Sequence, residues 1–200
     1  MPRPDLINIK KWIKTGSRVL DLGCGDGSLL AMLRDEIGVD GYGLEIEPEN
    51  IIQCIRKGIN VIQRDLDAGL SDFDEQAFDY VIMTQTLQAV HFPDRLLTEM
   101  LRVGHQGIVT FPNFGNWKNR LQLGFGGRMP VSRTLPAQWY DTMNIHLCTV
   151  KDFEDLCRQH DIRILESMVA DSAHRARTSN RFLPNLLGEI ALFRCQRGAS

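Results

Sequence analysis

The amino-acid sequence predicts an α/β fold, in which a three-layer, doubly wound and mostly parallel sheet carries helices on both faces. Three observations predict this class. Strand-like segments alternate with helix-length segments through the first half of the 200-residue chain, a glycine-rich turn follows the first strand, and seven strand-like segments occur in all. Strands that are connected through helices form right-handed βαβ units, and such units build a parallel sheet.

The first unit begins with residues 17–22, a Val- and Leu-containing run that reads "SRVLDL". Leucines at helical spacing then predict an amphipathic helix over residues 28–36. Gly38 marks the end of this helix, and "GYGLEI" predicts a second strand over residues 41–46.

The second unit begins with a helix predicted over residues 48–58. Pro48 stands in its first turn, and basic residues precede the glycine at its end, as the helix dipole favours. Residues 60–66 form the predicted third strand. Residues 77–84, "AFDYVIMT", have the strongest pattern of a buried strand in the chain.

An amphipathic helix is predicted over residues 93–104 and a fifth strand over residues 107–112. The alternation then stops. Residues 112–148 are rich in Gly, Asn, Pro and aromatic residues, and we expect no strand there. Trp117 and Leu121 have the spacing of neighbours on one face of a short helix.

Regular structure is predicted to resume at Thr149, a helix N-cap with Asp152 at the third helical position, followed by a helix over residues 152–160. The last two strands are expected at residues 162–170 and 189–195. The loop between them carries His174, Arg175, Arg177 and Arg181. This loop is either a solvated connection or an anion-binding surface.

Composition indicates one ordinary globular domain over residues 1–200, with 43% hydrophobic residues, 24% charged residues and a net charge of −2. This charge argues against a broad nucleic-acid-binding surface. The first residues lack the apolar stretch of a secretory signal, and no apolar run is long enough to span a bilayer. We therefore expect a cytoplasmic protein that binds neither membranes nor nucleic acid.

The five cysteines are scattered along the chain, and no pair has the spacing of a zinc-binding motif. We expect no metal site, and we expect reduced cysteines that pack as small apolar residues. They are Cys24, Cys54, Cys148, Cys157 and Cys195.

The glycine turn departs from the dinucleotide-binding pattern G-x-G-x-x-G, because Ser28 stands where the third glycine should be. The chain has G-x-G-x-G instead, preceded by Asp21 and containing Asp26. Two carboxylates would repel a pyrophosphate at the helix N-terminus and would attract a cationic ligand.

This turn resembles the first motif of the class I S-adenosylmethionine (SAM)-dependent methyltransferases, which have a Rossmann-like sheet with an antiparallel last strand. The resemblance implies SAM or S-adenosylhomocysteine (SAH) as ligand. Glu45 would accept hydrogen bonds from both ribose hydroxyls, Asp65 and Leu66 would contact adenine, and the backbone around Thr84 and Gln85 would lie near the methionyl group. The full set implied is Asp21, Gly23, Cys24, Gly25, Gly27, Glu45, Ile46, Asp65, Leu66, Thr84 and Gln85.

Two simpler interpretations stay open. Glu45 and Asp65 are then solvated loop carboxylates, or the glycines are required only by the backbone conformation of the turn. No catalytic residue can be named. Gln85 and Gln88 follow the fourth strand but cannot act as bases, and the amino-methyltransferase motif is missing there. The two candidate histidines, His91 and His146, are expected to have capping, solvent-exposed or structural roles.

A closer resemblance, to the MetW family of methionine-biosynthesis proteins, is carried by "VLDLGCGDGSLL", "VIMTQTLQAV", "WYDTMNIHLCT" and the whole 112–148 segment. It implies a role beside homoserine O-acyltransferase (MetX) as a partner. Two hypotheses follow: a SAM-binding subunit that promotes acyltransferase activity, or a small-molecule methyltransferase whose acceptor, so far unknown, enters under a lid formed by residues 112–148. The aromatic and arginine residues of that segment fit a lid as well as a protein interface. Nucleic-acid methylation is not expected.

Overall fold

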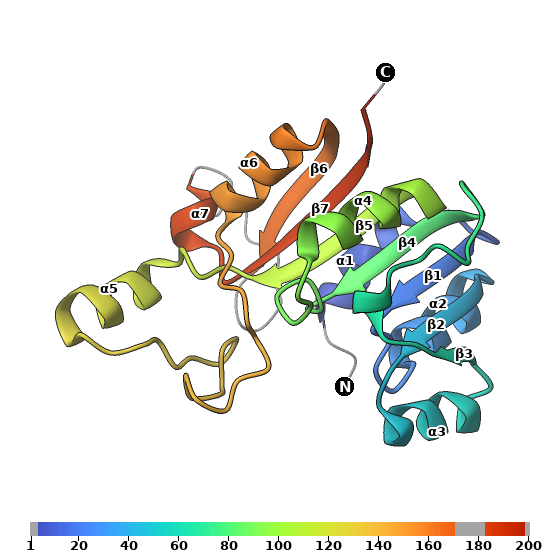
Figure 1. Cartoon of the computed structure of the whole chain (residues 1–200), viewed down its shortest axis with the longest axis horizontal. Coiled ribbons are helices and arrows are strands. Elements are labelled where there is room, and N and C mark those ends of the chain that lie inside the picture. The colour runs from blue at the N-terminus through green and yellow to red at the C-terminus, as the bar shows by residue number, and fades with distance from the viewer. Residues whose placement is uncertain (1–3, 171–182, 199–200) are drawn as a thin grey trace.

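The computed structural model describes residues 4–170 and 183–198, and its centre is a seven-stranded sheet (Figure 1). The strand order across the sheet is β3-β2-β1-β4-β5-β7-β6. The strands are β1 (Arg18–Leu22), β2 (Asp40–Glu45), β3 (Asn60–Gln63), β4 (Phe78–Thr84), β5 (Gly104–Pro112), β6 (Ile162–Ala170) and β7 (Ile190–Arg197).

Strands β1 to β5 pair in parallel, whereas β7 lies antiparallel to both β5 and β6. The predicted fold class, including the antiparallel last strand, is confirmed. The carboxyl ends of the five parallel strands therefore meet at one edge of the sheet, where ligands of such folds bind.

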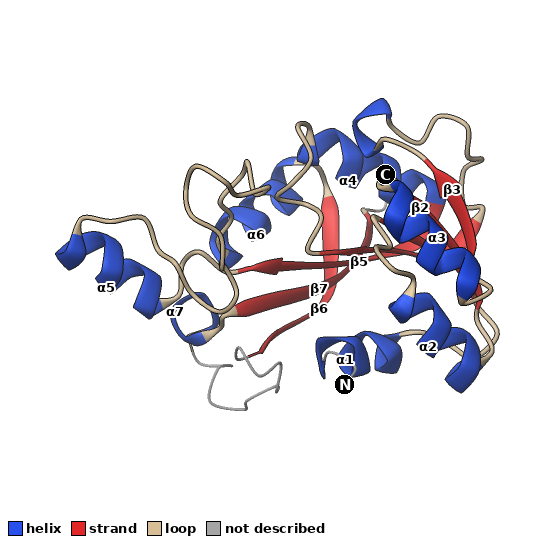
Figure 2. Ribbon diagram, turned by 90° about the horizontal axis from the view of Figure 1, so that it is seen from below, coloured by secondary structure: helices blue, strands red, loops and turns tan. Residues whose placement is uncertain are grey.

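Helices cover both faces of the sheet (Figure 2). The α-helices of the described residues are α1 (Pro4–Trp12), α2 (Ser28–Ile37), α3 (Pro48–Arg56), α4 (Pro93–Val103), α5 (Trp117–Gly126), α6 (Val150–Gln159) and α7 (Pro184–Leu187). Helices α4 and α6 bury residues in one hydrophobic cluster, and α1, α2 and α3 bury residues in the other. The first cluster includes a packed trio of rings, Phe111, Phe153 and Phe193, with centroids 4.6 to 5.9 Å apart.

Two strand boundaries differ from the prediction by three residues. The third strand ends at Gln63 rather than at residue 66, because Asp65 caps a 3-10 helix over Leu66–Ala68. The fifth strand begins at Gly104, because the chain passes from α4 into β5 without a loop. The predicted loop with His174, Arg175, Arg177 and Arg181 lies outside the described residues.

Helices α1 and α7 were not predicted. Helix α1 and the turn after it place Ile9, Trp12 and Ile13 in the second hydrophobic cluster. The spacing of these three apolar residues is a helical signal that was available in the sequence. The indole of Trp12 also donates a hydrogen bond to Glu166 of β6 at 2.8 Å.

Helix α5 follows the expectation from Trp117 and Leu121, but it does not lie on the sheet. It projects beyond the carboxyl end of β5, and the chain returns to α6 through residues 127–149, which form neither helix nor strand (Figures 1 and 2). Among the described residues, no helix combines the length and apolar character needed to cross a bilayer.

Candidate functional site

The turn between β1 and α2 is built from three glycines with left-handed backbone: Gly23 at φ 72°, Gly25 at φ 54° and Gly27 at φ 74°. Glycine adopts this conformation without the steric cost that other residues incur. The backbone N–H of Gly23 donates to the carbonyl of Leu44 at 2.9 Å, which ties the turn to the end of β2. A Cβ on Gly25 would meet no atom within 4 Å, so the backbone is open to close approach by a ligand there.

Two glycines make room for a pair of buried thiols under this turn. The Sγ atoms of Cys24 and Cys54 lie 3.8 Å apart. A Cβ on Gly43 would collide with Cys24 Sγ, and a Cβ on Gly27 would come within 2.9 Å of Cys54 Sγ. Burial, followed by the charge of Asp21, raises the pKa of Cys24 far above its ordinary value. All five cysteines are free thiols and four are buried, in agreement with the predicted apolar role.

Asp21 lies inside the sheet rather than on its surface. It belongs to β1, between Gly43 of β2 and Ile82 of β4, and only 1% of its surface is exposed. A charge in such a desolvated place interacts more strongly with a nearby cation than it would in water. An ionised Asp21 would therefore attract a cationic group placed beneath the glycine turn.

Glu45, at the end of β2, is also buried, and its carboxylate accepts three backbone hydrogen bonds. Oε2 accepts from the N–H of Gly25 at 2.8 Å, and Oε1 accepts from Ile46 at 2.8 Å and from Glu47 at 3.0 Å. A carboxylate offers about four acceptor positions. With these bonds in place, Glu45 has room for one further donor, and contact with two ribose hydroxyls stays a prediction.

The sequence predicted that Asp26 would help to repel a pyrophosphate, but a nearby lysine offsets the charge of Asp26. Lys57 Nζ lies 2.5 Å from Asp26 Oδ2, and the Ser28 hydroxyl donates to the same oxygen at 2.7 Å. Burial alone would raise the pKa of Asp26, but the hydrogen bonds from Lys57 and Ser28 outweigh it and lower that pKa. Asp21 and Glu45 are thus the carboxylates beside the turn that Lys57 does not offset.

This ion pair predicts a small pH dependence of stability. The pKa of Asp26 is lower in the folded chain than in the unfolded chain, so the pair stabilises the fold above the ordinary aspartate pKa and stops doing so as the pH falls through the lowered value. Both side chains are partly exposed, so the contribution is below about 1 kcal/mol. Urea unfolding of wild type and Asp26→Asn should differ near pH 7, and the difference should shrink between about pH 5 and pH 2. A difference that persists at the acidic end would contradict this assignment.

Asp65 and Leu66 lie just beyond β3, next to the end of β2. The Asp65 side chain accepts from the backbone N–H of Asp67 at 2.9 Å and so caps the 3-10 helix that starts at Leu66. Asp65 is exposed and Leu66 is half-buried. The structure thus gives Asp65 a local capping role, while contact of these two residues with adenine stays a prediction.

The end of β4 contains a backbone strain point. Gln85 has φ 56°, a left-handed value that is uncommon outside glycine and that clusters at functional sites. Its N–H donates to Thr110 of β5 at 2.8 Å, and its carbonyl accepts from the side chain of Gln88 at 2.9 Å. Thr86 packs against the turn, within 2.8 Å of where a Cβ of Gly23 would stand.

His91 and His146 both contact groups of the loops that follow the strands. The His91 ring lies 2.6 Å from Asp67 Oδ2 and is largely exposed. His146 Nε2 lies 3.3 Å from the carbonyl oxygen of His91. Both histidines thus join loops to one another, in line with the capping and structural roles expected for them.

The structure places the predicted residues along one sheet edge, at the ends of β1, β2, β3 and β4. It also adds residues that the sequence did not single out: Gly43, Lys57 and Thr86. Each contacts the glycine turn from a distant part of the chain, and no local motif marks such a residue. The arrangement combines open turn backbone with two buried carboxylates and is suited to a small cationic ligand.

Comparison with known proteins gives a family match over nearly the whole chain. Residues 3–195 match the family model of methionine biosynthesis protein MetW. The chain is 38% identical to the bifunctional methionine biosynthesis protein MetXA/MetW of Rhodopirellula baltica, over 95% of this chain and 32% of that protein. It is 28% identical to the demethylmenaquinone methyltransferase of Listeria monocytogenes, over 73% of this chain and 67% of that enzyme. The chain thus spans about a third of the length of the bifunctional relative.

Solved structures show the same fold at low sequence identity. A SAM-dependent methyltransferase from Mesorhizobium loti superimposes with a TM-score of 0.71 at 16% identity, covering 98% of this chain and 99% of that one. A Haloferax volcanii complex of the Trm112 methyltransferase activator with a methyltransferase gives a TM-score of 0.68 at 16% identity, covering 98% and 91%.

Proposed function

Because the chain belongs to the family of methionine biosynthesis protein MetW, we propose that it is a SAM-binding protein that associates with homoserine O-acyltransferase (MetX) and promotes its activity. One observation carries the partnership: the Rhodopirellula baltica relative is named MetXA/MetW, and this chain matches only 32% of it. Two domains that share one polypeptide are present at a high effective concentration relative to each other. When the same two domains are separate chains, they need a binding surface to stay close together.

The cofactor proposal rests on the site geometry. The turn backbone at Gly25 is open, and Asp21 and Glu45 are buried carboxylates beside it. These features fit a ligand with an ammonium and a sulfonium better than one with a pyrophosphate. The proposed cofactor-binding residues are Asp21, Gly23, Cys24, Gly25, Gly27, Glu45, Ile46, Asp65, Leu66, Thr84 and Gln85. SAM, when bound, supplies an electrophilic methyl group.

The alternative is a methyltransferase that acts on a small molecule. The sequence similarity to a demethylmenaquinone methyltransferase favours it. The side chains that follow β4, Gln85 and Gln88, offer no base, so an acceptor that is already nucleophilic, such as an amine, carboxylate or thiolate, would be needed. A screen of pathway metabolites for transfer of labelled methyl from SAM tests this alternative, with Gly25→Arg as the site control.

Reconstitution with the homoserine O-acyltransferase of the same organism tests the main proposal. We expect the two purified proteins to co-elute in size-exclusion chromatography and the acylation rate to rise when this chain is added. Titrating SAM into the mixture then shows whether the cofactor changes that rate. Absence of a complex together with an unchanged acylation rate would reject the proposal.

A further inference from the structure

Helix α5 and the loop after it form a lobe, residues 117–147, that leaves large apolar side chains exposed. Phe125 is 89% exposed, Met143 is 78% exposed, and Trp139 and Tyr140 are each 71% exposed. The other exposed large apolar residues of the lobe are Trp117, Leu121, Leu123, Met129, Val131, Ile145 and Leu147. A concentration of apolar surface on one segment marks an interaction site, and aromatic, Met and Arg side chains are enriched in interfaces.

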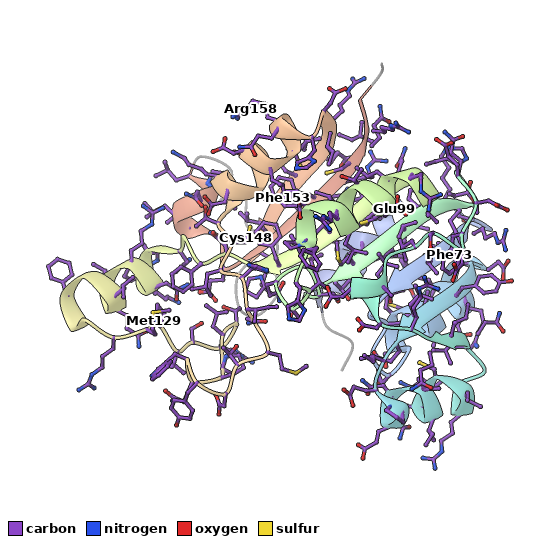
Figure 3. All side chains as sticks on the ribbon, viewed as in Figure 1. Phe73, Glu99, Met129, Cys148, Phe153 and Arg158 are labelled. Carbon is purple, nitrogen blue, oxygen red and sulfur yellow. The ribbon has the colours of Figure 1, made fainter. Side chains whose placement is uncertain are left out.

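The lobe stands clear of the sheet, with its side chains spread around it (Figure 3). Met129 lies between α5 and the returning chain, where it lines a small cavity of about 40 Å³ with Trp139, Phe114 and Leu135. Leu135 is buried beside this cavity, whereas most of the other large apolar side chains of the lobe are exposed.

The base of the lobe is held firmly by buried asparagines. Asn113 donates to the carbonyls of Asn185 at 3.1 Å and Gly188 at 2.8 Å, and it accepts from the N–H of Gly115 at 3.0 Å. Asn116 caps α5 and donates to Gly188 at 3.1 Å. A segment that is fixed at its base and bare on its outer face is preorganised for docking, which lowers the entropy lost on binding.

The charge of the lobe indicates the kind of partner. It contains four basic residues and one acidic residue, although the whole chain has a net charge of −2. Lys118 pairs with Glu189, whereas Arg128 and Arg133 are exposed and make no ion pair within the part of the chain that the structure describes. Packing the lobe against the same lobe of a second copy would bring like charges together, which disfavours a symmetric dimer through this surface.

The end of the lobe also touches the proposed cofactor site. The carbonyl of Gln88 accepts from the N–H groups of Ile145 at 2.9 Å and His146 at 3.0 Å, and the Gln88 side chain donates to the Gln85 carbonyl. A partner that contacts the end of the lobe would thus be connected to Gln85, at the strained end of β4, through the hydrogen bonds of Gln88.

We propose that this lobe is the surface through which the chain docks on homoserine O-acyltransferase, against an apolar patch bordered by carboxylates. The inference rests on the proposed function. It adds the surface, the chemistry of the partner face and a contact path to the cofactor site through Gln88.

Paired substitutions test the lobe. In the Phe125→Asp/Met143→Asp variant, affinity for the acyltransferase measured by calorimetry should fall by about 30-fold or more. Ile55→Asp is the matched control, because Ile55 is 63% exposed on α3, away from the lobe, and its effect should stay below about twofold. Arg128→Glu/Arg133→Glu should slow association, most clearly at low salt. Unchanged thermal unfolding shows that the variants remain folded.

The outcomes separate the two claims. If wild type does not bind the acyltransferase, the proposed function fails and the docking surface fails with it. If wild type binds and the lobe variants bind equally well, only the docking surface is overturned. If the lobe variants instead convert a self-associated chain to a monomer in sedimentation, a second copy is the occupant and the inference is wrong.

Discussion

Asp21→Asn is expected to lower the affinity for SAM by about 100-fold, because removing one partner of a buried charge pair costs several kcal/mol. The substitution keeps the shape of the side chain and removes only its charge. Asp21 is 1% exposed, so water screens that charge poorly. Calorimetric titration with SAM and with SAH measures the loss. Both ligands carry an ammonium and only SAM carries a sulfonium, so SAM binding should fall at least as much as SAH binding.

Asp26→Asn is the matched control for this experiment. It removes a carboxylate from the same turn, but one whose charge Lys57 already offsets at 2.5 Å. Its affinity for SAM should stay within about threefold of wild type. An Asp21→Asn protein that binds SAM normally while its melting temperature changes would show that Asp21 has a structural role only, and the cationic-ligand argument would fail.

Gly27→Ala is expected to lower the free energy of unfolding by about 3 kcal/mol, through two effects that add. Gly27 has φ 74°, a conformation that strains any residue with a side chain. A Cβ there would also lie 2.9 Å from the Sγ of Cys54, which is fully buried and has little room to move. Urea denaturation followed by circular dichroism measures the change.

Gly16→Ala separates the two effects. Gly16 has the same φ of 74°, but a Cβ there would meet nothing within 4 Å. Gly16→Ala should therefore lower the free energy of unfolding by about 1 kcal/mol, through the backbone strain alone. Adding Cys54→Ala to Gly27→Ala should recover part of the loss, because it removes the sulfur that the new methyl group strikes. Equal costs for Gly16→Ala and Gly27→Ala would show that packing against Cys54 is unimportant.

Much of the fold could be predicted because its signals are local. The runs of Val, Ile and Leu mark the buried strands, and the predicted capping box forms completely. Thr149 Oγ1 accepts from the N–H of Asp152 at 3.2 Å, and the Asp152 carboxylate accepts from the N–H of Thr149 at 3.0 Å. Where local signals conflict, prediction was wrong: Asp65 lies within the predicted strand over residues 60–66 but caps a 3-10 helix in the structure.

By itself, the sequence determined the chain order of the seven strands, the helices between them other than α7, and the position of the glycine turn, because side-chain periodicity and backbone preference act over a few neighbouring residues. Only the tertiary structure decided that Lys57 offsets the charge of Asp26, which lies 31 residues earlier in the sequence. It also decided that Glu45 accepts a hydrogen bond from Gly25, which lies 20 residues earlier. It also decided that α5 leaves the sheet with its apolar face uncovered. Contacts of this kind depend on how whole elements pack, so no short stretch of residues encodes them.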